Sequence, residues 1–287
     1  MSLLINELTK KQLDSYFTHP NNGMLIVGPR GSGKTALLKF AASKLLSLEE
    51  EKLENYPHIL FISAASKQLI SIDQIRDIDH FLARKVPGKT SGIKRLVLID
   101  DSEYMTTQAQ NALLKNLEEP PDDTAFILST SDQTKLLPTV RSRILAIRIN
   151  KPNNTDLENY LRSISSDQEL IAQAISISGG LIGLAVAIVS QSAEHPLVKA
   201  ATAGRQIISS KTYERLLLVN QLSKDTVFLK NTLGLIKLMA EIALKTAEDN
   251  QARKWYLILD LTYETEQKLV HNTNTKLNLT NFMLSMP

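Results

Sequence analysis

Met24-Leu-Ile-Val27 followed by Gly28-Pro-Arg-Gly-Ser-Gly33-Lys34-Thr35 is the stretch that decides the fold. The first four residues predict a short buried strand, and the helical pattern of Ala36 to Leu46 follows the loop directly. The loop satisfies the pattern G-x-x-x-x-G-K-[ST], in which glycines let backbone N–H groups curl around phosphate oxygens. Strand, glycine loop and helix in this order predict a phosphate-binding loop in an α/β fold.

Each residue type in this loop has a chemical reason to be there. Lys34 is expected to reach the terminal phosphates, and the hydroxyl of Thr35 to ligate magnesium. The expected ligand is therefore ATP or ADP with Mg²⁺; a glycine turn that holds no phosphate is the alternative. The residues expected to bind nucleotide are Gly28, Arg30, Gly31, Ser32, Gly33, Lys34 and Thr35.

Four further apolar runs alternate with segments of helical period. This alternation predicts a five-stranded parallel sheet covered by helices on both faces. Because the runs are almost continuously apolar, we expect their strands to be buried on both sides. A capping box at Thr107-x-x-Gln110 is predicted to open a helix that Pro120-Pro121 ends. The runs are His58 to Ile62, Leu96 to Ile99, Ala125 to Ser129 and Leu145 to Ile149.

Strand signals stop after Lys151-Pro-Asn-Asn154, and the rest of the chain is predicted to be helical. We therefore expect an α/β nucleotide-binding domain at residues 1–150, a small helical domain at 151–205 and a second helical domain at 206–287. Gly179-Gly180 and Gly183 are expected to begin the last helix of the small domain, and the polar stretch from Gly204 to Lys211 to lead into the next. The apolar stripe from Val227 to Ile242 is interpreted as core, with a partner surface as the alternative.

Two adjacent carboxylates end the third apolar run. Asp100 follows Ile99 directly and is expected to hold the magnesium ion together with Thr35. Asp101 is the nearest candidate for orienting an attacking water, although it is shorter than the glutamate that usually fills this role. Helix capping is the alternative function for such residues.

The amino-acid composition excludes several kinds of site and several classes of protein. The 287 residues include no cysteine, which excludes disulfides, thiolate chemistry and cysteine-based zinc sites. No run approaches the roughly 18 apolar residues that span a bilayer, so a cytoplasmic protein is expected. The net charge of +3 permits contact with nucleic acid without indicating a dedicated binder. The histidines, at 19, 58, 80, 195 and 271, lack metal-ligand spacing.

Longer segments resemble the bacterial DNA polymerase III clamp loaders, a family of AAA+ proteins. The resemblance rests on Asp73-Gln-Ile-Arg76, Leu98 to Met105, Asn111 to Pro121, Phe126 to Thr130 and Leu136 to Ile144, and it extends to Asn272 to Leu284. It implies a RecA-like ATPase domain, a helical lid and an oligomerising helical collar, corresponding to the three domains expected above. The delta-prime subunit is the member most similar, with gamma/tau close to it.

The resemblance also implies roles for single residues and for partners. Thr130 occupies the position of a sensor of the terminal phosphate. Ser142-Arg143-Ile144 occupies the place of a Ser-Arg-Cys motif whose arginine reaches nucleotide in the next subunit, so Arg143 is the expected arginine finger. The expected partners are gamma/tau-type and delta-type subunits in a hetero-pentamer, a sliding clamp and primer-template DNA, with no membrane.

Three departures from the family favour a subunit that hydrolyses little ATP by itself. The four zinc-binding cysteines of many bacterial members are absent, so no zinc is expected. Gly183 takes the place of an arginine that senses nucleotide from the lid, and Asp101 that of a glutamate. The leading hypothesis is a delta-prime-like stator. A gamma-type motor, another AAA+ DNA machine such as a helicase loader or branch-migration motor, and a scaffold without nucleotide are the rivals.

Overall fold

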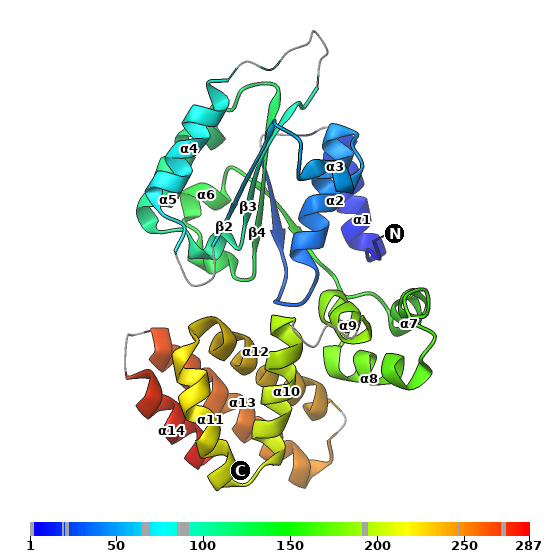
Figure 1. Ribbon diagram of the computed structural model, residues 1–287, viewed down its shortest axis with the longest axis vertical. Helices are drawn as coiled ribbons and strands as arrows, with labels where there is room; N and C mark the ends of the chain where they lie inside the picture. The colour runs from blue at the N-terminus through cyan, green and yellow to red at the C-terminus, as the bar shows by residue number, and fades with distance from the viewer. Residues whose placement is uncertain are drawn as a thin grey trace. The chain divides into compact units, whose positions relative to one another are not determined.

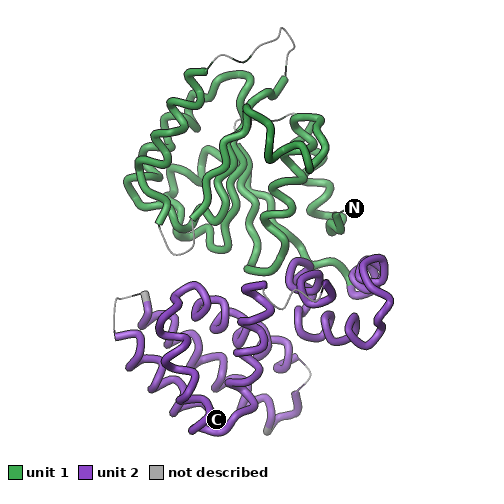
Figure 2. Tube along the Cα trace, viewed as in Figure 1, with its two compact units in different colours: residues 1–153 green, residues 154–287 purple. Residues whose placement is uncertain are grey.

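The chain folds into two compact units, residues 1–153 and 154–287 (Figure 2). The computed structural model describes residues 3–18, 20, 23–64, 69–84, 86, 92–190, 195–245, 247–270 and 274–287. The boundary between the units follows the point at which strands give way to helices in the sequence.

A five-stranded parallel sheet forms the centre of the first unit, as predicted. Its strands lie in the order β2-β3-β4-β1-β5, and every neighbouring pair is parallel. The predicted phosphate-binding loop follows β1, which lies between β4 and β5. The carboxyl ends of β3 and β4 lie near this loop. The strands are β1 (Gly23–Val27), β2 (Ile59–Ser63), β3 (Arg95–Asp100), β4 (Thr124–Thr130) and β5 (Leu145–Arg148).

Helices cover both faces of the sheet (Figure 1). α1, α2 and α3 lie on one face and α4, α5 and α6 on the other, so each face has its own apolar core. Alternate strand residues enter the two cores: Leu25 packs with α4 and α5, whereas Met24 and Ile26 pack with α1 and α2. The elements are α1 (Glu7–Thr18), α2 (Lys34–Leu46), α3 (Glu50–Leu53), α4 (Ile72–Leu82), α5 (Thr107–Glu118), α6 (Pro138–Arg141) and the 3₁₀ turns η1 (Ser102–Tyr104) and η2 (Gln133–Lys135).

Two local predictions for this unit are wrong. β1, β3 and β4 are buried on both sides, but β2 and β5 are edge strands that expose residues such as Phe61 and Leu145. The cap of α5 is Thr106, whose side chain accepts from the N–H of Ala109, one residue before the predicted capping box. The side chain of Gln110 is held elsewhere, because its Oε1 accepts from the N–H of Leu137 at 2.7 Å and its Nε2 donates to the carbonyls of Met105 and Lys135.

The second unit contains helices and no strand among its described residues. Gly179, with φ of 55°, ends α8, so the paired glycines close one helix, and Gly183 lies inside the next. Gly204 is buried within α10, and residue 205 falls in the same helix; the division into a 151–205 and a 206–287 domain stays a prediction. The helices are α7 (Asn154–Arg162), α8 (Gln168–Ser178), α9 (Ile182–Val189), α10 (Pro196–Ser209), α11 (Thr212–Lys224), α12 (Thr226–Leu244), α13 (Asp249–Val270) and α14 (Thr275–Ser285).

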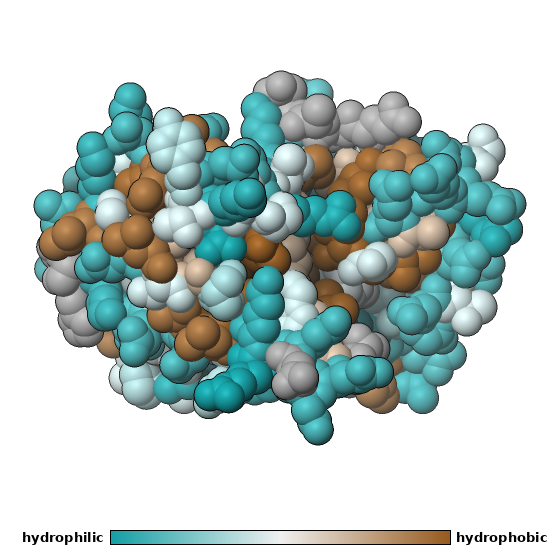
Figure 3. Space-filling model, turned by 90° about the horizontal axis from the view of Figure 1, so that it is seen from below, coloured by the Kyte–Doolittle hydropathy of each residue, from teal (hydrophilic) through white to brown (hydrophobic). Residues whose placement is uncertain are grey.

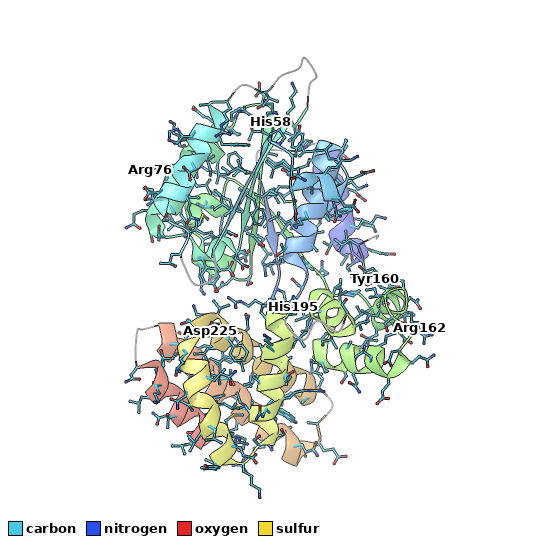
Figure 4. The ribbon with its side chains drawn as sticks, in the orientation of Figure 1. His58, Arg76, Tyr160, Arg162, His195 and Asp225 are labelled. Carbon is cyan, nitrogen blue, oxygen red and sulfur yellow. The ribbon has the colours of Figure 1, made fainter. Side chains whose placement is uncertain are left out.

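α12 provides the centre of this second core. Leu229, Leu233 and Ile236 of its apolar stripe are buried in one cluster with apolar residues of α13 and α14. His195, drawn in Figure 4, caps α10 by accepting from the N–H of Leu197 through Nδ1, a structural role. His19 and His271 lie outside the described residues. None of the helices within the described ranges is long and apolar enough to cross a membrane.

Arg95 forms a buried ion pair at the start of β3. Its Nη2 lies 2.6 Å from Asp123 Oδ1, and Nη1 donates to the carbonyls of Leu82 and Arg84. We predict that Arg95→Met lowers the free energy of unfolding by about 3 kcal/mol, because the carboxylate and both carbonyls lose their donor. Urea denaturation measures this value.

The matched control is Arg76→Met on the outer face of α4. Arg76 is exposed (Figure 4) and pairs with Asp73 at 3.3 Å. Its removal should change the free energy of unfolding by less than about 1 kcal/mol, since exposed ion pairs contribute little. Equal losses in the two variants would contradict the structural role assigned to Arg95.

Candidate nucleotide site

The phosphate-binding loop lies at the carboxyl edge of the sheet. Gly28 follows the last residue of β1, and its N–H donates to the carbonyl of Thr130, 3.1 Å away at the end of β4. Asp100 is the last residue of β3, the strand beside β4. The carboxyl ends of neighbouring parallel strands are where ligands bind in open α/β sheets, and three predicted site residues meet there.

Glycines in the loop are required by backbone conformation and by space. Gly31 and Gly33 have φ of 83° and 88°, a region that side chains with a Cβ adopt at a cost. A Cβ on Gly28 would lie 2.6 Å from Ser32 Oγ. The loop is therefore a tight concave turn that a larger residue would distort.

Ser32 and the start of α2 fit an anionic ligand. The Oγ atom of Ser32 is buried and has no hydrogen-bond partner among the residues that the structure describes. An unpaired buried hydroxyl is unfavourable, and it stands in the loop that leads directly into the 13-residue helix α2. Because the first N–H groups of a helix have no partner within the helix, this end favours negative charge. The residues present thus fit a phosphate group.

Lys34 places a buried positive charge at the base of the loop. Its side chain is 7% exposed, Nζ donates to Ser131 Oγ at 2.8 Å, and Asp101 Oδ1 lies 4.0 Å away. Burial lowers the pKa of Lys34, and the negative charges of Asp101, Glu103 and Asp100 oppose that shift. The ammonium group therefore lies near several carboxylates, but it forms no short ion pair with any carboxylate among the described residues.

Thr35 and Asp100, the two predicted magnesium ligands, contact one another. Thr35 Oγ1 donates to Asp100 Oδ2 at 2.7 Å, while Asp100 Oδ1 accepts from the hydroxyl of Ser129 and from the N–H of Asp101. A hydroxyl and a carboxylate held side by side next to a phosphate loop are the oxygen ligands that Mg²⁺ accepts. This pair fits the metal that the sequence predicts.

Asp101 occupies an unusual backbone position just beyond this pair. Its φ of 51° is left-handed, a conformation that Asp tolerates better than most residues, and its side chain is 46% exposed. Burial raises the pKa of the Asp101 carboxyl, and the positive charge of Lys34 opposes that shift. The carboxylate faces Lys34 and is accessible to water. Its role in orienting an attacking water stays a prediction.

Sequence reasoning missed two groups in this site. Glu103 is buried, and its Oε2 accepts from the N–H of Ser131 at 3.1 Å. Ser131 in turn holds Lys34, whereas Thr130, the predicted phosphate sensor, is fully buried and accepts from the N–H of Asp132. The signal available was that Ser131 immediately follows the strand-end threonine. Nothing in the spacing of Glu103 marks it.

Arg30 also has a partner that the sequence did not indicate. Its guanidinium donates to the hydroxyl of Tyr104 and lies 5.9 Å from the centre of that ring. Burial raises the pKa of Tyr104, and the positive charge of Arg30 opposes the shift. The tyrosine therefore tethers the phosphate loop to η1, the turn that follows Asp101.

Arg143 lies apart from all these residues, at the opposite edge of the sheet. It precedes β5, whose first residue, Leu145, is in register with Met24, the second residue of β1. Gly28 is four positions beyond Met24, which corresponds to a rise of about 13 Å along the strand. An extended arginine side chain is shorter than this distance. Arg143 is thus placed away from the phosphate loop of its own chain.

Comparison with known families now connects this geometry to a protein class. A family model described as "DNA polymerase III, delta subunit" matches residues 5–153, just over half of the chain. Similar curated proteins are subunits of the same polymerase. This chain is a member of the DNA polymerase III clamp-loader family. The α/β unit with its phosphate loop is the part of this clamp-loader chain that the family match covers.

Individual relatives of the clamp-loader chain match it over part of their length. The DNA polymerase III subunit delta' of Pseudomonas aeruginosa is 29% identical over 54% of this chain and 52% of its own. The subunit gamma of a Buchnera aphidicola strain is 32% identical over 50% of this chain and 42% of its own. The chain therefore spans about half the length of these relatives. A DNA polymerase III, gamma subunit-related protein of Thermotoga maritima shares the fold, with a TM-score of 0.56, 18% identity and coverage of 97% and 98%.

Proposed function

We propose that this clamp-loader chain binds ATP or ADP with Mg²⁺, hydrolyses little of it alone, and supplies Arg143 to nucleotide held by a neighbouring subunit. The observation that carries the proposal is the placement of its two functional groups. A complete phosphate site stands at the carboxyl edge of the sheet, and the arginine stands at the amino edge. We infer that each group faces a different neighbour.

The residues of the phosphate site divide the work of binding. Gly28, Gly31 and Gly33 let the backbone approach the phosphates, and the unpaired hydroxyl of Ser32 gains a partner there. Lys34 balances the phosphate charge. When bound, magnesium neutralises charge on the phosphate oxygens. Thr35 and Asp100 would hold it.

Weak hydrolysis is expected because of the second acidic residue. Asp101 is one methylene shorter than glutamate and faces Lys34, 4.0 Å away, so part of its charge is already balanced. A water that it oriented would have to lie closer to the backbone than one held by a longer side chain. We infer that this chain positions attacking water poorly.

Assembly with other subunits follows from the same proposal. We infer a hetero-oligomer with gamma/tau-type and delta-type subunits that acts on a sliding clamp and primed DNA in the cytoplasm. Figure 3 shows apolar patches, in brown, between polar ones on the face drawn. A neighbour could cover apolar side chains of the second unit. Those that solvent reaches include Tyr213, Leu217, Tyr256, Leu277 and Leu284.

Calorimetric titration of the purified chain with ATP and ADP, with and without Mg²⁺, tests nucleotide binding. Steady-state hydrolysis is then compared for the chain alone and for its complex with a gamma-type subunit, clamp and primed DNA. The proposal expects binding together with negligible turnover by the chain alone. Absence of nucleotide binding would contradict the proposal and support a scaffold subunit that binds no nucleotide.

A gamma-type motor is the second candidate, and the contact between Thr35 and Asp100 favours it. These residues are joined at 2.7 Å, so the metal-binding half of a hydrolytic site is intact. Turnover by the purified chain that disappears in Lys34→Met would establish this candidate.

The hydroxyl of Thr35 should control the magnesium dependence of binding. We predict that Thr35→Val reduces the tightening of ATP binding by Mg²⁺ about tenfold, since one oxygen ligand and its hydrogen bond are lost. Valine keeps the branched shape, so the start of α2 is preserved. Thr35→Ser, which retains the hydroxyl, is the control and should behave like the natural chain. Similar Mg²⁺ dependence in the valine variant would contradict the assigned ligand.

A further inference from the structure

Glu118 lies beside the guanidinium of Arg143 at the amino edge of the sheet. Its Oε1 is 2.6 Å from Arg143 Nη2, and the side chains of Arg143 and Glu118 are 35% and 48% exposed. Glu118 is the last residue of α5, just before Glu119 and the two prolines that follow. The carboxylate therefore comes from a fixed helix end, whereas Arg143 comes from the turn between α6 and β5.

Neither helix formation nor stability accounts for a carboxylate at this position. The last carbonyls of a helix have no partner within it and carry partial negative charge, so glutamate is unfavourable there. An exposed ion pair returns little stability. Orientation of Arg143 does account for it, because the carboxylate limits where the guanidinium can lie.

The contacts of Arg143 leave part of its guanidinium available. Nη1 donates to the carbonyl of Thr139 at 2.9 Å and to Ser142 Oγ at 3.2 Å, and Nη2 contacts Glu118. An arginine has five N–H donors. These three contacts leave two donors, one of them on Nε, without a partner among the residues that the structure describes. Two donors are enough for a bidentate contact with phosphate oxygens.

We propose that Glu118 is a positioning residue that holds Arg143 ready for nucleotide bound by the neighbouring subunit. This inference rests on the function proposed above, in which Arg143 acts across a subunit boundary. A free arginine side chain samples many rotamers, and those that reach the phosphate must be selected at each turnover. Glu118, Thr139 and Ser142 restrict the guanidinium in advance, so less freedom is lost when the transition state forms.

Glu118→Gln tests this role in the assembled complex with a gamma-type ATPase subunit, clamp and primed DNA. Glutamine keeps the size of the side chain and removes its charge, so the ion pair becomes a weaker hydrogen bond from the charged guanidinium to a neutral amide oxygen. Steady-state ATP hydrolysis should show a kcat about fivefold lower, with KM for ATP and assembly unchanged. Glu118→Asp, which keeps the charge on a shorter arm, should recover part of the loss.

Glu119→Gln is the matched control, because Glu119 is the next carboxylate and forms no ion pair with any residue that the structure describes. It should retain the natural kcat, and thermal unfolding of both glutamine variants should agree. Equal or faster turnover in Glu118→Gln would overturn the positioning role, as would an equal loss in Glu119→Gln. If Arg143→Ala itself leaves turnover unchanged, the proposed function fails and this inference fails with it. A loss in Arg143→Ala without one in Glu118→Gln would overturn the inference alone.

Discussion

Lys34→Met is expected to weaken ATP binding by this chain about 100-fold. Charge-assisted hydrogen bonds contribute about 1.5–3 kcal/mol each, and each 1.4 kcal/mol corresponds to a tenfold change in affinity. The variant also leaves Asp100, Asp101 and Glu103 facing the phosphates without the cation that offsets them. Titration calorimetry with ATP and Mg²⁺ measures the change.

The control for this variant is Lys39→Met on the same helix. Lys39 is exposed and pairs with Glu54 at 3.1 Å, so its loss should leave ATP affinity unchanged. Methionine keeps most of the apolar stem of lysine, and the nearest carboxylate oxygen of Asp101 lies 4.0 Å from Lys34, so this replacement should not unfold the chain. Affinities of the two variants within about threefold of one another would mean that Lys34 does not hold phosphate.

Arg143→Ala is expected to lower ATP turnover by the assembled complex about 100-fold or more, while ATP binding by the isolated chain stays unchanged. An arginine that stabilises charge on a transferred phosphoryl group contributes about 10³ to 10⁵ in rate in comparable enzymes. The expected loss applies to a complex in which the nucleotide site served by Arg143 limits the turnover of all the subunits. DNA-stimulated hydrolysis in the steady state measures the effect.

Arg141→Ala provides the comparison for that experiment. Arg141 is exposed at the end of α6, two residues before Arg143, and should tolerate replacement. A fall in the activity of the isolated chain alone, with the complex unaffected, would contradict a role across the subunit boundary. The two variants together distinguish the effect of removing the guanidinium of Arg143 from the effect of removing any positive charge in this turn.

The sequence predicted the fold and the phosphate loop because both depend on local patterns. An apolar strand, a glycine loop and a helix follow one another without interruption. Thr35 and Asp100 could be predicted to lie close together because the carboxyl ends of parallel strands meet at the same edge of a sheet. Contacts between side chains from distant segments could not be predicted in this way. Arg30 with Tyr104, and Lys34 with Ser131, depend on rotamers and on the exact path of two turns.

Errors in the prediction have similar causes. An apolar run such as Leu145 to Ile149 does not show whether a strand is central or at an edge, since that depends on the strand order. Gly204 was interpreted as part of a polar connection, but it lies inside α10, where its small size allows the helix to approach α12 near Ile236. Helix packing, rather than chain flexibility, explains that glycine.

The opposite placement of Arg143 and the phosphate loop on one parallel sheet gives the chain a direction. A contact that joins the arginine edge of one subunit to the nucleotide edge of the next uses two different surfaces, so it is heterologous. Repetition of such a contact closes into a ring or continues as a spiral, and it cannot produce a two-fold dimer in which one patch meets its own copy. A subunit at the end of an open assembly would therefore present either an unused arginine or an unserved nucleotide site. Under the proposed function, the polarity of a single sheet thereby sets the direction in which one subunit joins the next.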